Sequence, residues 1–383
     1  MTEPTPDDNT TSKPAIAQET LSDLKEMAER THTINEGENM KKEKELRDKI
    51  FNEKYADQNS EYYKETNQAR VDKANTPGAK KIKVDSFGDG EVTMIAQINT
   101  QKHVTESGII VEGEVMDGHD YNPEAQTFSE IETQWAHYLA TTPPEERLVI
   151  YEGPPMDEQF FGSRESAIAD SRRGDSGHVQ WLARENSVET QGAEVGNIEQ
   201  LAKFEKDGVS RDEAMLFFTL RSLAAEYNNK PVPEDLAMNF HFVLAQLETP
   251  GFTIFTEEQK QYLLEHPDEL VAEKQKVLPY VEKLNEILRA DGKPELVVTG
   301  DGKIGFADAV TNADVLDWIE AGNTGRLAEI SRLNIQGRDE GIFETIADAT
   351  QTGKKPFVVY GGSHVVSLEP VLKEYYGSQQ VLE

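Results

Sequence analysis

The stretch Phe357–His364 reads FVVYGGSH, an aromatic and β-branched run followed at once by two glycines and a histidine. Leu148–Tyr151 (LVIY) and Gly108–Val115 (GIIVEGEV) are further short apolar runs of this kind. Such runs are typical of strands that helices cover on both faces of a parallel sheet. Amphipathic helical patterns occupy 124–140 and 340–350, between the runs. We therefore predict an α/β fold, with a mainly parallel sheet and helices on both of its faces.

The rest of the chain divides into an extension, a domain and an insertion. Residues 1–79 are acidic, polar and poor in apolar side chains, so we expect a partly helical or disordered extension that is dispensable for folding. The α/β domain is predicted over 80–383 and opens with a hairpin formed by 81–85 and 92–98. Helical patterns dominate 197–335 and predict an insertion that caps the sheet.

The chain is strongly acidic, with 71 Asp and Glu against 39 Lys and Arg and a formal net charge of -32. This charge repels phosphate backbones and anionic lipid, so we expect neither a nucleic-acid nor a membrane partner. It favours cations or a basic protein partner for the extension, and adaptation to high salt is an alternative. The acidic start, MTEPTPDDNTT, differs from a signal peptide, and no long apolar run occurs. A cytoplasmic location is the expectation.

Polar side chains follow each apolar run. Glu114 is the penultimate residue of the first run and His119 follows it, Glu152 follows the second run and His364 follows the third. The carboxyl ends of parallel strands meet at one edge of a sheet, where ligands commonly bind. A turn or a helix cap explains each residue singly, but three such loops together favour a shared, solvent-facing pocket. We expect the imidazoles of His119 and His364 to face that pocket.

The order of these motifs resembles the superfamily of erythromycin esterases, ChaN-like haem-uptake proteins and TraB/TIKI proteins. The resemblance spans roughly residues 109–376 and rests on Gly113-Glu114 with His119, Leu148–Gly153, Arg184–Glu194, Arg338-Asp339 and Phe357–His364. Four residues separate Glu114 from His119, more than is usual in relatives, so Asp117 is an alternative to Glu114. The resemblance implies ester or peptide hydrolysis in some members, metal-assisted in TIKI-like proteins, and ligand binding in others.

Two chemistries suit these residues. His119, Glu152 and His364 are the types of ligand that bind Mn²⁺, Co²⁺ or Zn²⁺ with a position left for water. Without a metal, a histidine would act as general base on water while Arg338 stabilises an oxyanion. The sequence has no cysteine and no G-x-S-x-G elbow, which favours water as the nucleophile. We predict a hydrolase that acts on a small molecule or a peptide through Glu114 and these four residues.

Two other functions remain open at this stage. A non-enzymatic haem-binding protein would need a tyrosine or histidine facing an apolar pocket, and Tyr121 and Tyr360 are the candidates. A regulatory or scaffold protein would keep the fold and use its acidic extension to recruit a partner.

Overall fold

The computed structural model describes residues 39–379, apart from 75, 77, 81, 89–91, 98–101, 105–109, 113–125, 154–161, 170–173, 225–229, 249–261 and 263–264. Two compact units divide the chain, residues 1–53 and residues 54–383. The described part of the first unit is helical. The candidate site lies within the second unit.

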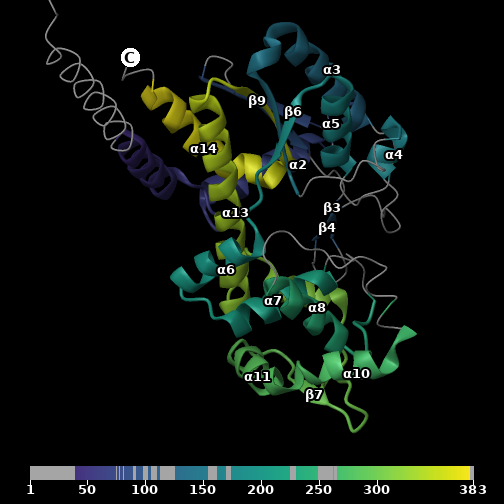
Figure 1. The fold of residues 1–383 in the computed structure, drawn as a ribbon. Helices are drawn as coiled ribbons and strands as arrows, with labels where there is room; N and C mark the ends of the chain where they lie inside the picture. The colour runs from purple at the N-terminus through teal and green to yellow at the C-terminus, as the bar shows by residue number, and fades with distance from the viewer. Residues whose placement is uncertain are drawn as a thin grey trace, which may run out of the picture. The chain divides into compact units, whose positions relative to one another are not determined.

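A five-stranded sheet organises the second unit (Figure 1). Its order is β1 (Ile82–Phe87), β2 (Val92–Gln97), β9 (Lys355–Gly361), β5 (Arg147–Tyr151) and β6 (Glu189–Gly192). β1 pairs antiparallel with β2, as the hairpin prediction requires, and all other neighbours are parallel. The prediction of an α/β fold with a mainly parallel sheet is therefore confirmed.

Both faces of the central strand β9 are buried. The helices that contact the sheet include α3 (Gln126–Thr141), α5 (Gly174–Glu185), α13 (Arg326–Gln351) and α14 (Gly362–Gln379). Phe357 and Val359 pack in one apolar cluster with side chains of α3 and α5. Val358 and Tyr360 alternate with them, so they point to the opposite face, and they are equally inaccessible. This two-sided burial explains why FVVY is apolar throughout.

The described part of the run Gly108–Val115 is not in the central sheet, so the prediction that places it there is wrong. Its described part, β4 (Ile110–Glu112), pairs antiparallel with β3 (Lys102–Val104) in a separate two-stranded sheet. The position beside β9 belongs instead to β2, the second strand of the hairpin. A short apolar run favours a strand but does not determine its partner.

The helical pattern that ends at 335 and the one predicted over 340–350 meet in one 26-residue helix, α13. Gly337 and Gly341 interrupt the apolar pattern in its middle, but they do not end the helix. A Cβ on Gly341 would lie 3.1 Å from Cγ1 of Val195 and 3.3 Å from the carbonyl oxygen of Ala193. A side chain at this position would require Val195 or the backbone at Ala193 to shift by a few tenths of an ångström, because the helix passes very close to the loop that follows β6.

Between β6 and β9 the chain is mainly helical. The described elements before α13 are α6 (Asn197–Lys206), α7 (Arg211–Ala224), α8 (Ala237–Glu248), α10 (Pro267–Gln275), η4 (Leu278–Tyr280), α11 (Val281–Ala290), the pair β7 (Leu296–Val298) and β8 (Ile304–Phe306), and α12 (Asn312–Ile319). They bury a hydrophobic cluster of their own, which includes Phe217, Phe240 and Leu284. No helix in the described ranges is long and apolar enough to cross a membrane.

Residues 54–74, which include α2 (Glu61–Ala74), contact α14. Ala56 and Tyr63 form an apolar cluster with Val366, and the Ala56 N–H donates to the carbonyl oxygen of Ser367 at 3.4 Å. The boundary expected near residue 79 stays a prediction. These contacts nevertheless tie part of the expected extension to the α/β unit.

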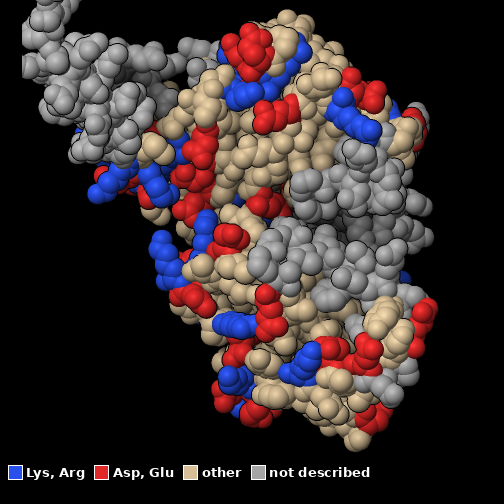
Figure 2. Space-filling view, viewed as in Figure 1, with Lys and Arg blue, Asp and Glu red and all other residues tan. Residues whose placement is uncertain are grey.

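Acidic and basic side chains are interspersed on the face of the molecule shown in Figure 2. Several exposed side chains form ion pairs, such as Arg211 with Glu248 at 2.7 Å and Arg289 with Glu295 at 3.0 Å. Exposed pairs of this kind add little to stability, because water solvates both partners well.

Candidate functional site

Three parallel strands deliver polar side chains to one edge of the sheet. Glu152 follows β5 directly, Glu194 lies two residues after β6, and His364 stands in the first turn of α14, just after β9. A Cβ on Gly192, the last residue of β6, would lie 2.7 Å from the carbonyl oxygen of Gly153. Glycine at 192 thus lets the ends of β5 and β6 approach closely, which brings the two glutamates together.

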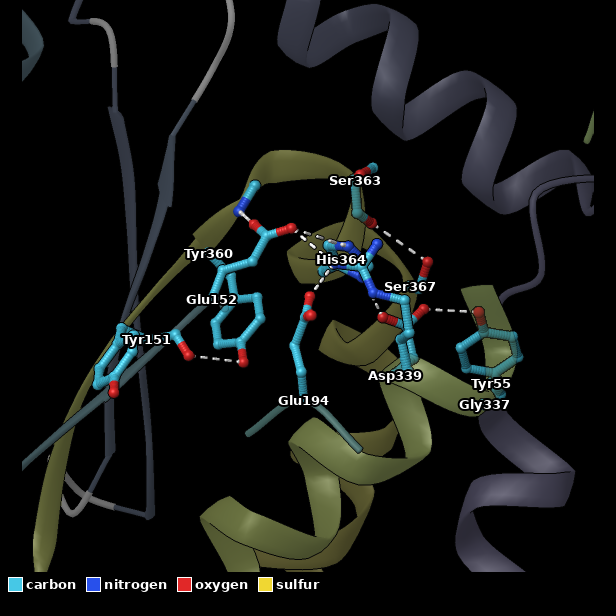
Figure 3. A network of polar contacts seen from close by, with 12 residues as sticks. Tyr55, Tyr151, Glu152, Glu194, Gly337, Asp339, Tyr360, Ser363, His364 and Ser367 are labelled. Carbon is cyan, nitrogen blue, oxygen red and sulfur yellow. Dashed lines mark hydrogen bonds and ion pairs between the residues drawn. The ribbon is translucent and has the colours of Figure 1, made fainter. Parts of the chain in front are cut away.

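Arg338 of α13 binds both glutamates. Its Nη2 donates to Oε1 of Glu152 at 2.7 Å and to Oε1 of Glu194, and the N–H of Gly361 donates to Oε2 of Glu152 at 3.2 Å. Figure 3 shows the two carboxylates converging beside His364. Burial alone would raise the pKa of Glu152, but the positive charge of Arg338, the electrostatic interaction with His364 and these hydrogen bonds lower it to about 2. Glu152 is therefore an anion at neutral pH.

His364 is held by a further carboxylate, that of Asp339, which follows Arg338 on α13. Nδ1 of the imidazole is hydrogen-bonded to Oδ1 of Asp339, a side chain with no solvent exposure. A carboxylate acceptor at Nδ1 selects the tautomer that carries its proton there and leaves Nε2 as a base. Nε2 lies 4.0 Å from Oε1 of Glu152. The imidazole thus lies between one carboxylate that orients it and another that faces its free nitrogen.

Asp175, near the start of α5, is a further carboxyl group of this region. Burial and the negative charge of Glu152 raise its pKa to about 7, against hydrogen bonds from backbone N–H groups that include that of Ser176. A carboxyl group with such a pKa is partly protonated at neutral pH and can donate a proton. No apolar strand immediately precedes Asp175 in the sequence, so its position along the chain does not mark it as a site residue.

The structure brings together three of the five predicted site residues, Glu152, Arg338 and His364. Glu114 and His119 lie outside the described residues. The topological reason for placing them beside His364 no longer holds, because the run before them is not a strand of the central sheet. Asp339 belongs to the motif Arg338-Asp339, but its position next to an imidazole became visible only in the structure.

The described residues do not form a full metal-ligand set. Nδ1 of His364 is used by Asp339, and Glu152 is bound by Arg338, which leaves Nε2 as the one open histidine donor of this constellation. Within the described ranges, no three His, Asp and Glu side chains are placed to hold a metal ion. The third expected ligand, His119, is not among the described residues.

Tyr360 does not have the environment expected of a haem ligand. Its side chain is fully buried, and its hydroxyl donates to the carbonyl oxygen of Tyr151 at 2.9 Å. Burial and the charges of Glu194 and Glu152 raise its pKa well above the ordinary value, so it stays a neutral donor. The other candidate, Tyr121, lies outside the described residues.

A second, partly buried polar cluster lies between α3, α4 (Arg164–Ala169) and α5. Nε2 of His178 is 3.0 Å from Oε1 of Glu132, and Arg164 donates to the same oxygen. Burial lowers the pKa of His178 to about 4 despite the neighbouring carboxylate. The imidazole is therefore neutral at pH 7, and its edge-to-face contact with Phe128 suits a packing role.

Comparison of the chain with protein-family models, with curated proteins and with solved structures finds no match.

Proposed function

We propose that the protein is a hydrolase of ester or peptide bonds in which water is the nucleophile and His364 is the general base. The observation that carries the proposal is the fixed imidazole: Asp339 accepts at Nδ1, and Nε2 faces Glu152 across 4.0 Å. A water on Nε2 would lose its proton to that nitrogen as its oxygen attacks the carbonyl carbon. Asp339 would stabilise the imidazolium that forms, as the orienting carboxylate does in other histidine-based sites.

The neighbouring groups have complementary roles in this proposal. Arg338 has five N–H donors, and among the described residues only Nη2 is hydrogen-bonded, to the two glutamates. Its other N–H groups would stabilise the oxyanion that develops on the carbonyl oxygen. Glu152, 4.0 Å from Nε2, would add to the stabilisation of the imidazolium. Asp175 would protonate the leaving group.

The order of motifs that resembles the erythromycin esterase and TIKI superfamily supports the same reaction class. In the structure, Glu152, Glu194, Arg338 and His364 come from four of the matched stretches and lie within one constellation. Activation of the water by a divalent metal is the alternative, and the assays with added metal ions test it. The substrate would be a small molecule or a peptide.

The test is hydrolysis of a panel of nitrophenyl esters and fluorogenic peptides by the full chain, with and without added Mn²⁺, Co²⁺ or Zn²⁺. Activity should be lost in His364→Asn and fall steeply in Glu152→Gln. In H₂¹⁸O, the label should enter the carboxylate product. His137→Ala is the control, because His137 is exposed on the outer face of α3 and should not affect turnover.

Asparagine is chosen because its side-chain amide can still donate to Asp339. The expectation that His364 faces solvent, so that its removal costs little stability, is wrong: its side chain is only 6% exposed. Alanine would leave the buried Asp339 carboxylate without its imidazole partner, which is destabilising in itself. Full activity in a folded His364→Asn protein would refute the proposed function.

A further inference from the structure

Tyr55 lies next to the imidazole–carboxylate pair although it is distant from it in sequence. Its hydroxyl donates to Oδ2 of Asp339 at 2.6 Å, while Oδ1 of the same carboxylate takes Nδ1 of His364. Figure 3 shows Tyr55 and His364 bonded to this one side chain. Burial, then the charge of Asp339 and the hydrogen bond to it, raise the pKa of Tyr55 far above the ordinary value. Tyr55 is therefore a permanent donor.

A buried carboxylate needs such a second partner to hold one orientation. Asp339 has no solvent exposure, so water does not satisfy Oδ2. With a single partner, the carboxylate is free to turn about its terminal torsion and present either oxygen, or neither, to the imidazole. A donor on each oxygen removes that freedom. The orientation of His364 then depends on both bonds.

The segment that carries Tyr55 is anchored independently of this hydroxyl. Tyr62 donates to Oε2 of Glu369 at 3.3 Å, and Nζ of Lys54 lies 3.3 Å from Oε2 of Glu374. Ala56 and Tyr63 pack against Val366. These contacts involve α14, the helix that also carries His364. Removing one hydroxyl from Tyr55 should therefore leave the segment in place.

We propose that Tyr55 is a positioning residue of the site: its hydroxyl fixes the Asp339 carboxylate so that His364 keeps its proton on Nδ1 and exposes Nε2. The catalytic consequence rests on the proposed hydrolase function, whereas the effect on the imidazole does not. Residues 54–74 would then be part of the functional site, and not a dispensable part of the amino-terminal region.

The experiment is ¹⁵N NMR of the His364 ring in the full chain, with Tyr55→Phe compared with wild type and with Tyr62→Phe. Both variants lose one tyrosine hydroxyl from the same segment, but only the first loses a bond to Asp339. In wild type and Tyr62→Phe, the two ring nitrogens should show the separate shifts of a protonated Nδ1 and a bare Nε2. In Tyr55→Phe, the two shifts should move toward each other as the tautomers mix.

If a hydrolysed substrate is found, Tyr55→Phe should lower kcat about 10-fold, the change expected from one hydrogen bond to a charged group, and leave KM unchanged. If the ¹⁵N shifts of His364 are the same in Tyr55→Phe as in wild type, the inference is wrong. This holds even if Tyr55→Phe has a lower melting temperature than Tyr62→Phe. A further measurement needs no variant: in wild type the Tyr55 hydroxyl proton should exchange slowly with water, and fast exchange would also overturn the inference. Failure to find any substrate would affect only the proposed function.

Discussion

Replacing Arg338 by glutamine removes the cation that lies between two carboxylates. Nη2 of Arg338 lies 2.7 Å from Glu152 and also contacts Glu194, and the side chains of Arg338 and Glu194 are only 14% and 11% exposed. Removing one partner of a buried ion pair costs about 3–5 kcal/mol, because the remaining charge is uncompensated. The side chain of Glu152 is 33% exposed, so water offsets part of this cost. We expect a loss of about 2–4 kcal/mol in the free energy of unfolding at pH 7.

The loss should depend on pH in a defined direction. The pKa of Glu152 is lowered in the folded protein to about 2, from 4.5. Such a group stabilises the fold above the higher value, and the stabilisation is lost as the pH falls toward the lower one. Without Arg338 the pKa of Glu152 rises, because the guanidinium no longer opposes the effect of burial. The difference between wild type and variant should therefore shrink between about pH 5 and pH 2.

Urea unfolding followed by tryptophan fluorescence, from pH 3 to pH 8, measures this difference. Arg289→Gln is the matched control: it removes the same charge from an exposed pair with Glu295 and should change stability little. A cost for Arg338→Gln that is the same at pH 3 and pH 7 would contradict the reasoning. A cost no larger than that of Arg289→Gln would do so as well.

Three further outcomes follow from other parts of the structure. Gly192→Ala places a methyl group 2.7 Å from a backbone oxygen, so we expect a loss of about 1–3 kcal/mol in the free energy of unfolding and a loss of activity. Gly300→Ala, where the added methyl group would have nothing within 4 Å, should change neither quantity in the same unfolding and turnover assays. His178 is buried and neutral with its pKa lowered to about 4, so wild type should lose stability as the pH falls from about 6.5 to 4, and His178→Asn should flatten that part of the measured curve. Deleting residues 1–79 should lower the melting temperature in calorimetry more than deleting 1–53 does, because it also removes the contacts with α14; equal melting temperatures would support a dispensable extension.

Two strands that lead to the site, β5 and β9, could be predicted from sequence for a physical reason. A strand covered on both faces must be apolar at every position, and LVIY and FVVY satisfy that condition. In a parallel sheet the residues that follow such strands share one edge, so Glu152 and His364 could be placed near each other from their positions alone. The prediction succeeds because each buried position must be apolar, so a buried strand can be recognised from a short stretch of sequence.

The same reasoning fails where the structure depends on a choice of partner. GIIVEGEV is as apolar as a covered strand at its start, yet β4 pairs with β3 outside the central sheet. The hairpin strand β2 lies beside β9 instead. Strand propensity does not specify which edge a strand joins, because that depends on packing across the whole sheet. The expectation for Glu114 and His119 lost its basis with this single assignment.

The roles of Asp339 and Tyr55 beside His364 cannot be recognised from their sequence neighbours. Asp339 lies in a helix with a polar, glycine-containing pattern, and Tyr55 lies in a region whose composition suggested an appendage. The motif Arg338-Asp339 marks Asp339, but the role of neither residue is recognisable until the fold places a tyrosine hydroxyl on one oxygen of the Asp339 carboxylate and an imidazole nitrogen on the other. A residue that acts through another residue is defined by a long-range hydrogen bond, and its sequence neighbours carry no information about that bond. The orientation of His364, and with it the proposed chemistry, therefore depends on a tyrosine in the region whose composition suggested an extension.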